Sequence, residues 1–466
     1  MPRSALTSSL LALLLAACGG AGGASQGSTG PAWGEATSAA ASSSTGADPD
    51  AAVTYYRDIK PILDARCVRC HVAGDITPLA LTTLEEVRPF AEALAAVTAD
   101  GSMPPWPPDA ACRGYAHDRS LGPGEREALR AWSELGAPAG DPADAPPGPG
   151  DPGDEPVVHD VELVIDPPYQ PNPGVDERRC FLFDWPKDQV SFVTALDVAP
   201  GDRRIVHHAI AYAIPPEYVD LYRAYDEVDP NVPGYPCFGG PDPGGASPLP
   251  WLGAWTPGTV GGAFPAGTGV RVLPGSLLAL QIHYRLRPGM NADRSRLRLR
   301  TAASVERPAV ALAFTDPEWI TGLTPMLIPA GTPDVVHAYE LDLASVLPLL
   351  VPDGPFVPGG AFVVRAAALH QNLLGTRSDL RVLRSGGAQD CVLDVPRWDS
   401  DWEGSYELLA PVAVAPGDRV RLECHWDNSA GNQPIVQGAP QAPRDVLWGE
   451  DSRDEMCLGV LYITAE

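Results

Sequence analysis

Positively charged side chains are in short supply in this chain of 466 residues. It has 33 Lys and Arg side chains against 59 Asp and Glu side chains, so its formal net charge at pH 7 is −26. Proteins that bind nucleic acid need basic side chains to neutralise phosphates. We therefore expect no nucleic-acid partner and attribute most of the acidic surplus to a solvated surface.

Long apolar runs and familiar enzyme signatures are also missing. Beyond an apolar leader at the N-terminus, no run of about 20 apolar residues could form a helix across a bilayer. The sequence contains no Gly-x-Ser-x-Gly motif and no Gly-rich nucleotide loop in a suitable context. Its 47 Gly and 52 Pro disfavour long helices, whereas a hydrophobic content of 44% is enough for several cores. The composition thus predicts a globular and mainly β protein.

The leader points to export and a lipid anchor. Residues 1–17 precede Cys18, and the sequence LAAC at 15–18 resembles a bacterial lipobox, in which the leader is cut before a cysteine whose thiol is then acylated. Gly19 follows, as in lipoproteins sorted to the outer membrane. We expect a protein of the bacterial cell envelope, held by this lipid alone in the outer membrane and facing the periplasm or the cell surface. An ordinary cleaved signal with an incidental cysteine is the alternative.

Two low-complexity stretches divide the rest of the chain. Residues 18–52 are mostly Gly, Ala, Ser and Thr, which cannot bury enough surface to offset their ordering entropy, so we expect a flexible tether. Residues 138–156 are rich in Pro, Gly and acidic residues and predict an extended linker. Between them lies a first unit, residues 53–137.

The first unit carries the sequence CVRCH at 67–71. Cys67 and Cys70 are one helical turn apart and His71 follows, a spacing that lets both sulfurs attach to a porphyrin while the imidazole reaches its iron. A zinc site or a redox pair is the alternative, but zinc needs two further ligands nearby. The adjoining histidine and the exported context favour haem c.

Met103, in the sequence MPPW at 103–106, is the candidate for the second axial ligand of the iron. The two prolines stiffen the loop that presents its thioether. His117 is the rival ligand, and a packing role for Met103 is a further alternative. With helices expected at 55–63 and 124–135, the unit resembles a small monohaem cytochrome c domain, which implies an all-α fold and electron transfer.

Residues 157–466 have the pattern of β-sandwiches. Short alternating or apolar runs are separated by Pro and Gly, and strands are expected at 190–198, 205–214, 277–286, 362–369 and 420–424. This length exceeds that of one ordinary sandwich, so we expect two sandwiches that divide near residues 306–317.

Histidines inside these runs carry the argument about function. The chain has only nine, and an imidazole on an apolar strand needs a partner. Adjacent strand residues point to opposite faces, so His207 and His208 can share a metal only where the strand is distorted or ends. On composition alone, hydrogen-bonded core histidines are the simpler interpretation.

Four motifs that contain histidine or methionine favour a metal instead: VHHAI at 206–210, LQIHY at 280–284, HQNLLG at 370–375 and DEMC at 454–457. In this order they resemble the copper type II, ascorbate-dependent monooxygenases, which include the peptidylglycine and dopamine hydroxylases. The resemblance implies two jelly-roll sandwiches, at 157–310 and 311–466, with one copper each. Together with the first unit, it predicts a multidomain chain in which a small all-α cytochrome c-like domain precedes two all-β jelly-roll sandwiches.

The resemblance also implies the copper ligands. His207, His208 and His283 correspond to the three-histidine site that transfers electrons, and imidazole suits copper. His370 and Met456 correspond to two ligands of the second copper, where oxygen is activated and the Met thioether favours Cu(I).

One position departs from the family pattern. The second site of the family has His-x-His, whereas this sequence has Asn372 in the later position, and a neutral amide is a poor ligand for Cu(I). The second site is then weakened, or it recruits His425 or His337, or oxygen chemistry is lost while the first copper persists.

Six cysteines remain once Cys18 and the haem thiols are set aside: Cys112, Cys180, Cys237, Cys391, Cys424 and Cys457. Disulfides suit an exported protein, and six cysteines allow many pairings. The resemblance implies a disulfide between Cys424 and Cys457, which would pin the strand beside Met456. A Cys180–Cys237 pair is a weaker expectation, and no motif supports a Cys112–Cys391 pair.

The leading expectation is a copper-dependent monooxygenase that hydroxylates a small or peptide-like organic substrate with dioxygen. The tethered haem c would donate or relay electrons that come from a redox partner protein or a diffusible reductant. The alternative is a non-catalytic, lipid-anchored electron-transfer or copper-binding protein whose second copper site is degenerate at Asn372. A purely structural β protein, the third possibility, would bind no copper.

Overall fold

The structure is a computed structural model, and it describes residues 52–75, 77, 79–146, 157–172, 177–237, 239–242, 249, 251–257, 262–285, 291–436, 439–449, 451 and 453–466. The leader, the lipidated Cys18 and all but the last residue of the tether predicted at 18–52 lie outside these ranges, as does the second half of the predicted linker. Residues Ala52–Glu466 form one compact unit. Among the described residues, no helix has the length and apolar character needed to cross a bilayer.

The chain between the two predicted linkers is helical. A π-helical turn at Tyr55–Ile59 leads into four helices: α1 (Lys60–Arg66), α2 (Leu84–Val87), α3 (Ala91–Ala99) and α4 (Pro123–Glu134). The helices predicted near 55–63 and 124–135 are therefore confirmed. Leu63, Leu129 and Trp132 pack together in the core of this part. Leu135 follows the last helical residue of α4 and is 54% exposed.

Ten strands and one helix form the N-terminal β-region: β1 (Val161–Val164), β2 (Glu177–Asp184), β3 (Ser191–Ala199), β4 (Val206–Ile214), α5 (Val219–Asp226), β5 (Tyr235–Pro236), β6 (Trp251–Trp255), β7 (Thr268–Val272), β8 (Leu277–Tyr284), β9 (Arg296–Ala302) and β10 (Arg307–Phe314). Their order in the sheet is β1-β9-β3-β7-β10-β6-β4-β8-β2-β5. Strand β8 is buried along its whole length because it carries apolar residues on both faces. This strand and its neighbour β4 carry the candidate metal ligands.

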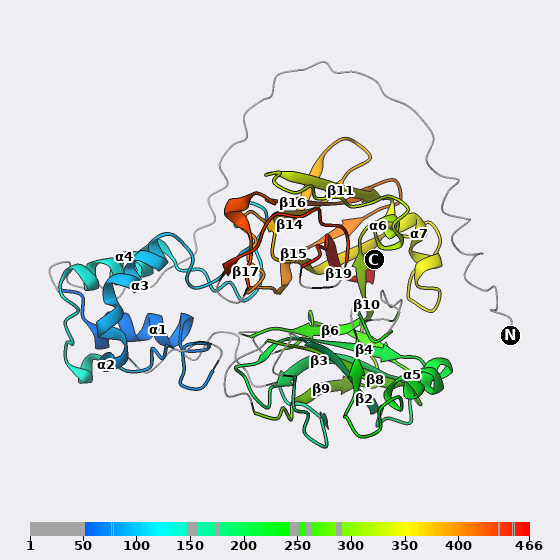
Figure 1. Ribbon diagram of the computed structural model, residues 1–466, viewed down its shortest axis with the longest axis horizontal. Helices are drawn as coiled ribbons and strands as arrows, with labels where there is room; N and C mark the ends of the chain where they lie inside the picture. Colours follow the sequence, from blue (N-terminus) through cyan, green and yellow to red (C-terminus); the bar gives the residue numbers. More distant parts are fainter. Residues whose placement is uncertain are drawn as a thin grey trace, which may run out of the picture. The chain divides into compact units, whose positions relative to one another are not determined.

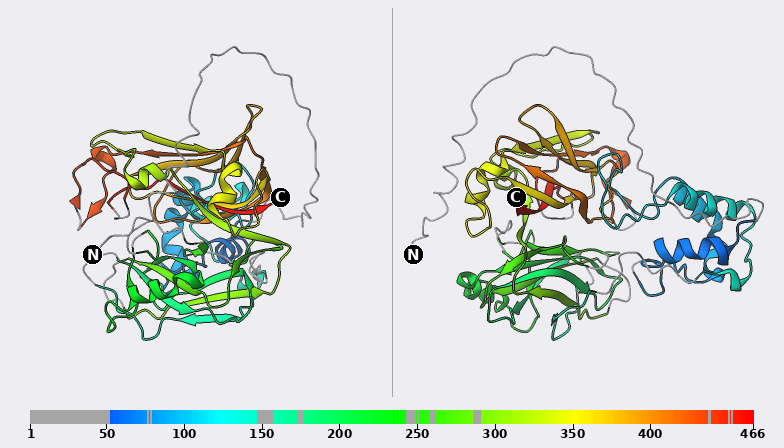
Figure 2. Two further views of the ribbon diagram at one scale, coloured as in Figure 1. Left: turned by 90° about the vertical axis from the view of Figure 1, so that its right-hand side faces the viewer. Right: turned by 180° about the vertical axis from the view of Figure 1, so that it is seen from behind.

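Nine strands and two helices form the C-terminal β-region: α6 (Pro317–Thr321), β11 (Val335–Leu341), α7 (Leu343–Leu350), β12 (Phe362–His370), β13 (Gly375–Leu383), β14 (Gln389–Val395), β15 (Ser405–Val414), β16 (Arg419–Trp426), β17 (Ile435–Val436), β18 (Ala439–Pro440) and β19 (Leu458–Ala465). A four-stranded sheet, β11-β16-β13-β14, packs on β12, β15 and β19. Figure 2 shows these layers from two further sides. The packing is that of a jelly-roll-like β-sandwich, and the five predicted strands are all found.

The two β-regions are not separate domains, and the predicted fold class is wrong on this point. Strand β10 pairs with β6 and β7 of the N-terminal region and with β19 of the C-terminal region, so one sheet of 13 strands runs through both (Figure 1). The residues near 306–317 that we took as a boundary instead lie in or beside this shared strand. Helices α5, α6 and α7 also show that neither region is all-β.

The prediction of a separate all-α cytochrome c-like domain is wrong as well. Residues 103–119 leave the helices and bind to the C-terminal β-region through backbone hydrogen bonds, including Asp109 N to Asp394 O at 2.8 Å and Ala116 N to Glu407 O at 2.9 Å. Tyr115 forms a β-bridge with Leu408. These contacts join the helices to a mainly β unit, because a segment without regular structure satisfies its backbone groups on the neighbouring strands.

The disulfides support the same conclusion. The structure contains Cys424–Cys457 and Cys180–Cys237, as expected, and also Cys112–Cys391, for which the sequence offered no support. The last of these links the segment 103–119 to β14 across a sequence separation of 279 residues.

We expect the variant Cys112→Ala/Cys391→Ala to lose about 2 to 4 kcal/mol of unfolding free energy, because the disulfide closes a long loop in the unfolded chain. Urea unfolding would measure this loss, and limited proteolysis should show new cleavage within residues 103–119. Cys180→Ala/Cys237→Ala, which opens a loop of 57 residues elsewhere, should not expose that segment. Equal resistance to protease with and without Cys112–Cys391 would contradict the prediction.

Candidate metal centre

Three histidines meet where β4 and β8 pair. His208 on β4 lies opposite His283 on the antiparallel strand β8. The register shifts between Val206 and His208, which marks an irregularity in β4. A bulge of this kind re-aims neighbouring side chains, so His207 and His208 both reach the same point despite being adjacent. The distortion that the sequence required for a shared metal is therefore present.

The ring nitrogens are close enough for one ion. One ligand atom from each of His207, His208 and His283 lies within 4.8 Å of the others. The Nδ1 atoms of His207 and His208 are 3.3 Å apart. Metal–nitrogen bonds of about 2.0–2.1 Å place neighbouring ligand nitrogens about 3.3 Å apart in a tetrahedral site, so this spacing fits.

Burial leaves these imidazoles neutral and poorly partnered. Burial lowers the pKa of His207 and, to a greater extent, the pKa values of His208 and His283. Both ring nitrogens of His283 and Nε2 of His207 have no hydrogen-bond partner. A buried polar atom without a partner is costly unless something else binds it. Neutral imidazoles with free lone pairs are the form that binds a metal ion, so the cluster fits copper.

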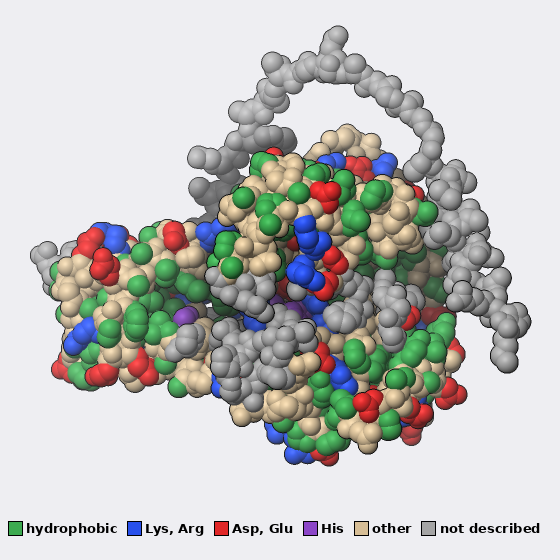
Figure 3. Space-filling model, viewed as in Figure 1, with side chains coloured by type: hydrophobic (Ala, Val, Ile, Leu, Met, Phe, Trp, Pro, Cys, Tyr) green, Lys and Arg blue, Asp and Glu red, His purple; other side chains and the backbone are tan. Residues whose placement is uncertain are grey.

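A cavity of about 300 Å³ lies beside the cluster. His208 lines it from β4, His370 from the end of β12, and Met456 from the segment before β19. Trp106 and His117 of the docked segment complete another part of its wall. Figure 3 shows histidine side chains within the hollow between the two β-regions. The structure thus brings one candidate ligand of the first copper site, His208, and both candidate ligands of the second, His370 and Met456, to one cavity.

His370 has an acidic partner that the sequence did not reveal. Its Nδ1 atom is 3.0 Å from Oε1 of Glu403, and the other oxygen of Glu403 is 3.6 Å from Nδ1 of His208. Burial by itself would lower the pKa of His370, but the charge and hydrogen bond of Glu403 outweigh this effect and raise it. Burial opposes ionisation of Glu403, yet His370 holds the pKa of Glu403 below its usual value. Without a metal, the two groups form an ion pair.

Asn372 does not take the place of the missing histidine. Its side-chain amide donates to the carbonyl oxygens of Asp454, at 2.9 Å, and Asp451, at 3.4 Å. Its backbone N–H donates to Glu455, at 2.9 Å. Asn372 therefore holds the loop that leads to Met456, which is a structural role.

Glu455 is the centre of this anchor. It is fully buried and accepts hydrogen bonds from the backbone of Asn372 and Leu374 and from Nε1 of Trp426, all at 2.7 to 2.9 Å. One carboxylate thus ties the strand that ends at His370 to the segment that carries Met456.

We expect Glu455→Ala to lower the unfolding free energy by about 3 to 5 kcal/mol, because it leaves three buried N–H donors unpaired. Asp451→Ala is the matched control, since that carboxylate is exposed and pairs only with neighbouring surface groups in the loop. Chemical denaturation of both variants checks the difference. A loss below about 1 kcal/mol for Glu455→Ala would show that water replaces the carboxylate.

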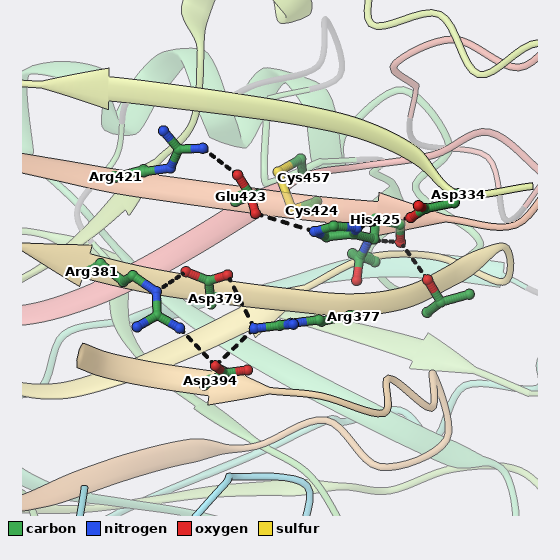
Figure 4. Close-up of polar contacts among 12 residues, drawn as sticks. Asp334, Arg377, Asp379, Arg381, Asp394, Arg421, Glu423, Cys424, His425 and Cys457 are labelled. Carbon is green, nitrogen blue, oxygen red and sulfur yellow. Dashed lines mark hydrogen bonds and ion pairs between the residues drawn. A yellow bond between two sulfur atoms is a disulfide. The ribbon is translucent and has the colours of Figure 1, made fainter. Parts of the chain in front are cut away.

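The two proposed replacement ligands lie elsewhere. His425 on β16 pairs through Nδ1 with Asp334, at 3.1 Å, and through Nε2 with Glu423, at 3.2 Å (Figure 4). His337 on β11 donates from Nε2 to the carbonyl oxygen of Leu327. Neither lines the cavity. The structure gives no support to the alternative that one of them completes the second site, because both belong to the four-stranded sheet that packs on the other side of β12.

The candidate haem residues follow α1. Cys67 and Cys70 are free thiols, and burial raises the pKa of Cys67 to about 12 and also raises the pKa of Cys70. His71 Nδ1 lies 2.9 Å from the carbonyl oxygen of Leu79. If it donates there, Nε2 stays available for a metal, so these residues fit a haem.

The structure separates the two candidates for the sixth iron ligand. Met103 lies in the loop after α3, where its backbone N–H donates to Val97. His117 lies on the wall of the cavity beside the copper candidates. Trp106, three residues after Met103, stacks edge-on against Tyr406 with ring centroids 5.3 Å apart. Tyr406 also lines the cavity.

Comparisons with known proteins do not assign the chain to a family. No family model matches the sequence, and no curated protein matches it. Among solved structures, one similar chain comes from the top component of cowpea mosaic virus, the naturally occurring empty particles. It is 9% identical, the match covers 62% of this chain and 77% of that chain, and the TM-score is 0.20. A likeness this weak bears on neither fold nor function.

Proposed function

We propose that the protein is a copper-dependent oxidoreductase of the monooxygenase type, which hydroxylates an organic substrate with dioxygen. The observation that carries the proposal is the cluster of His207, His208 and His283, neutral and short of partners, beside a cavity that also contains His370 and Met456. Copper, when bound, supplies one-electron redox chemistry and the activation of dioxygen. The sequence motifs described above agree with this chemistry.

The residues around the cavity have separate roles in this proposal. The three histidines hold the first copper, and His370 and Met456 hold the second. A volume of about 300 Å³ is at the lower end for small-molecule sites, so we propose a small substrate or the end of a peptide-like one. Apolar side chains such as Leu252 and Phe264 line part of the wall and exclude water from the reacting groups.

We propose that a haem c attached to Cys67 and Cys70, with His71 as axial ligand and Met103 as the second ligand, delivers electrons. Hydroxylation inserts one oxygen atom of dioxygen into a C–H bond and reduces the other to water, which consumes two electrons and two protons. Held by Cys67, Cys70, His71 and Met103, a haem would supply one-electron transfer from a redox partner protein or a diffusible reductant. The contact between Trp106 and Tyr406 supports this path, because it joins the haem-bearing segment to the cavity wall. The lipid anchor at Cys18 would place the reaction in the bacterial cell envelope.

A second function is favoured by one observation. The side-chain amide of Asn372 donates hydrogen bonds to carbonyl oxygens of the loop before Met456. The position where the family pattern has its second imidazole therefore supplies no ligand to the second site. The protein could then be a non-catalytic electron-transfer or copper-binding protein with a single copper.

A single-turnover experiment distinguishes the two functions. The reduced, copper-loaded protein is mixed with dioxygen and a panel of small alcohols, amides and peptides, and both haem reoxidation and product are followed. We expect substrate-dependent reoxidation and one hydroxylated product per two electrons, and we expect His208→Ala to abolish both. One bound copper per chain and no product across the panel would favour the carrier, and no copper at all would exclude both functions.

A further inference from the structure

Glu403 lies between the two histidine sites. It belongs to the loop that joins β14 to β15, and its side chain is 15% exposed. Oxygen Oε1 is 3.0 Å from Nδ1 of His370, and oxygen Oε2 is 3.6 Å from Nδ1 of His208. The two oxygens of one carboxylate therefore face one imidazole from each site.

These distances suit coordination. Metal–ligand bonds of about 2.0–2.2 Å place adjacent ligand atoms of one ion about 3 to 3.5 Å apart. The separation of Oε1 from His370 falls in this range, and that of Oε2 from His208 lies just above it. Met456, the other candidate at the second site, lines the same cavity.

The negative charge of Glu403 also favours binding to a metal ion. The other candidate ligands are neutral imidazoles and a thioether, so Glu403 is the member of the set whose charge offsets that of a bound cation. Buried charges in proteins are usually paired or bound to metals. The carboxylate of Glu403 lies 3.0 Å from Nδ1 of His370, so it would also face an ion bound to that nitrogen.

We propose that Glu403 is a metal ligand that bridges the two sites, with Oε1 completing the second site beside His370 and Met456 and Oε2 reaching the ion held by His207, His208 and His283. Glu403 thereby supplies the donor that Asn372 does not. The inference rests on the proposed copper centre. Because a carboxylate is harder than imidazole, it shifts the second site toward the oxidised metal and away from Cu(I).

The test uses the full chain loaded with Cu(II). It compares the wild type with Glu403→Gln, Glu403→Asp and the control Glu407→Gln. Glu407 also lines the cavity, but the histidine that interacts with it is His117. Elemental analysis gives copper per chain, competition with a chromophoric chelator gives Kd, and electron paramagnetic resonance gives the number of unpaired spins. Thermal unfolding of each variant shows that it folds.

We expect the wild type and Glu407→Gln to bind two coppers with fewer than two detectable spins, because a carboxylate bridge couples the ions. Glu403→Gln should bind the second copper about 10- to 100-fold more weakly and show uncoupled spins. Glu403→Asp retains the negative charge, but its shorter side chain moves the carboxylate oxygens away from the two ions. This variant should therefore lose the spin coupling between them. Unchanged copper affinity and unchanged spectra in Glu403→Gln would overturn the proposed bridge, although the chain would remain a copper protein. An equal loss of copper affinity and spin coupling in Glu407→Gln would also overturn the bridge. A wild-type chain without copper would overturn both proposals.

Discussion

Replacing His283 with Leu is expected to remove one copper per chain while leaving the metal-free protein as stable as before or more stable. Both ring nitrogens of His283 are buried without a hydrogen-bond partner, and the side chain lies opposite His208 in an apolar strand pair. An apolar side chain of similar size removes this unpaired polar group, so the unfolding free energy should rise by about 1 to 3 kcal/mol. Copper analysis and urea unfolding of the metal-free protein provide the two measurements.

The sign of the stability change distinguishes a ligand from a core histidine. If His283 served the fold, its replacement would cost stability and leave the copper content unchanged. His425→Ala is the matched control, because that imidazole is satisfied by Asp334 and Glu423 on the outer sheet. We expect it to keep all its copper. A loss of stability in His283→Leu greater than about 2 kcal/mol, with copper retained, would mean that the cluster is structural.

The second large effect is expected at the CVRCH sequence. Cys67→Ala/Cys70→Ala should abolish covalently attached haem entirely, since each thioether bond needs a cysteine sulfur. Intact mass after unfolding and the pyridine haemochrome spectrum measure the attachment. The structural reason for this expectation is that both cysteines are free thiols on the segment that follows α1.

Two further variants test the proposed axial ligand of the haem and the choice of the cysteines that attach it. His71→Ala should retain the thioether bonds but change the spin state of the iron, because it removes the proposed axial imidazole. Cys112→Ala/Cys391→Ala removes two other cysteines, which form a disulfide, and should keep full haem attachment. Expression with a haem-attachment system that yields no haem in the unaltered chain would contradict the prediction.

Local pattern was enough to predict much of the secondary structure. Apolar runs bounded by Pro and Gly located strands such as β4, β8 and β12, because alternation and burial act within a few residues. The three histidines could be proposed as a group only through the motif resemblance. The regular alternation of side chains along a strand would place His207 and His208 on opposite faces of the sheet. The irregularity in β4 brings the two side chains together.

Other features of the candidate site had no signal in the sequence. Glu403 is one of several acidic residues in a loop rich in Trp and Asp, and nothing in that loop distinguishes it from Asp401, whose carboxylate pairs with Arg285 and lies 4.0 Å from Nε2 of His207. Its position depends on where β15 begins relative to β12. Similarly, Trp106 and His117 reach the cavity because backbone hydrogen bonds hold their segment on β15.

The sequence by itself indicated which short stretches extend or coil and which side chains could bind a metal, and the motif resemblance implied the Cys424–Cys457 disulfide that the structure contains. The tertiary structure alone decided that the helices and the two β-regions form one unit and that His208 lines the same cavity as His370 and Met456. The reason is that strand pairing and docking join residues hundreds of positions apart, as β10 with β19 and Cys112 with Cys391 do. Such contacts depend on the whole chain's backbone hydrogen bonds, which no local pattern of residues encodes.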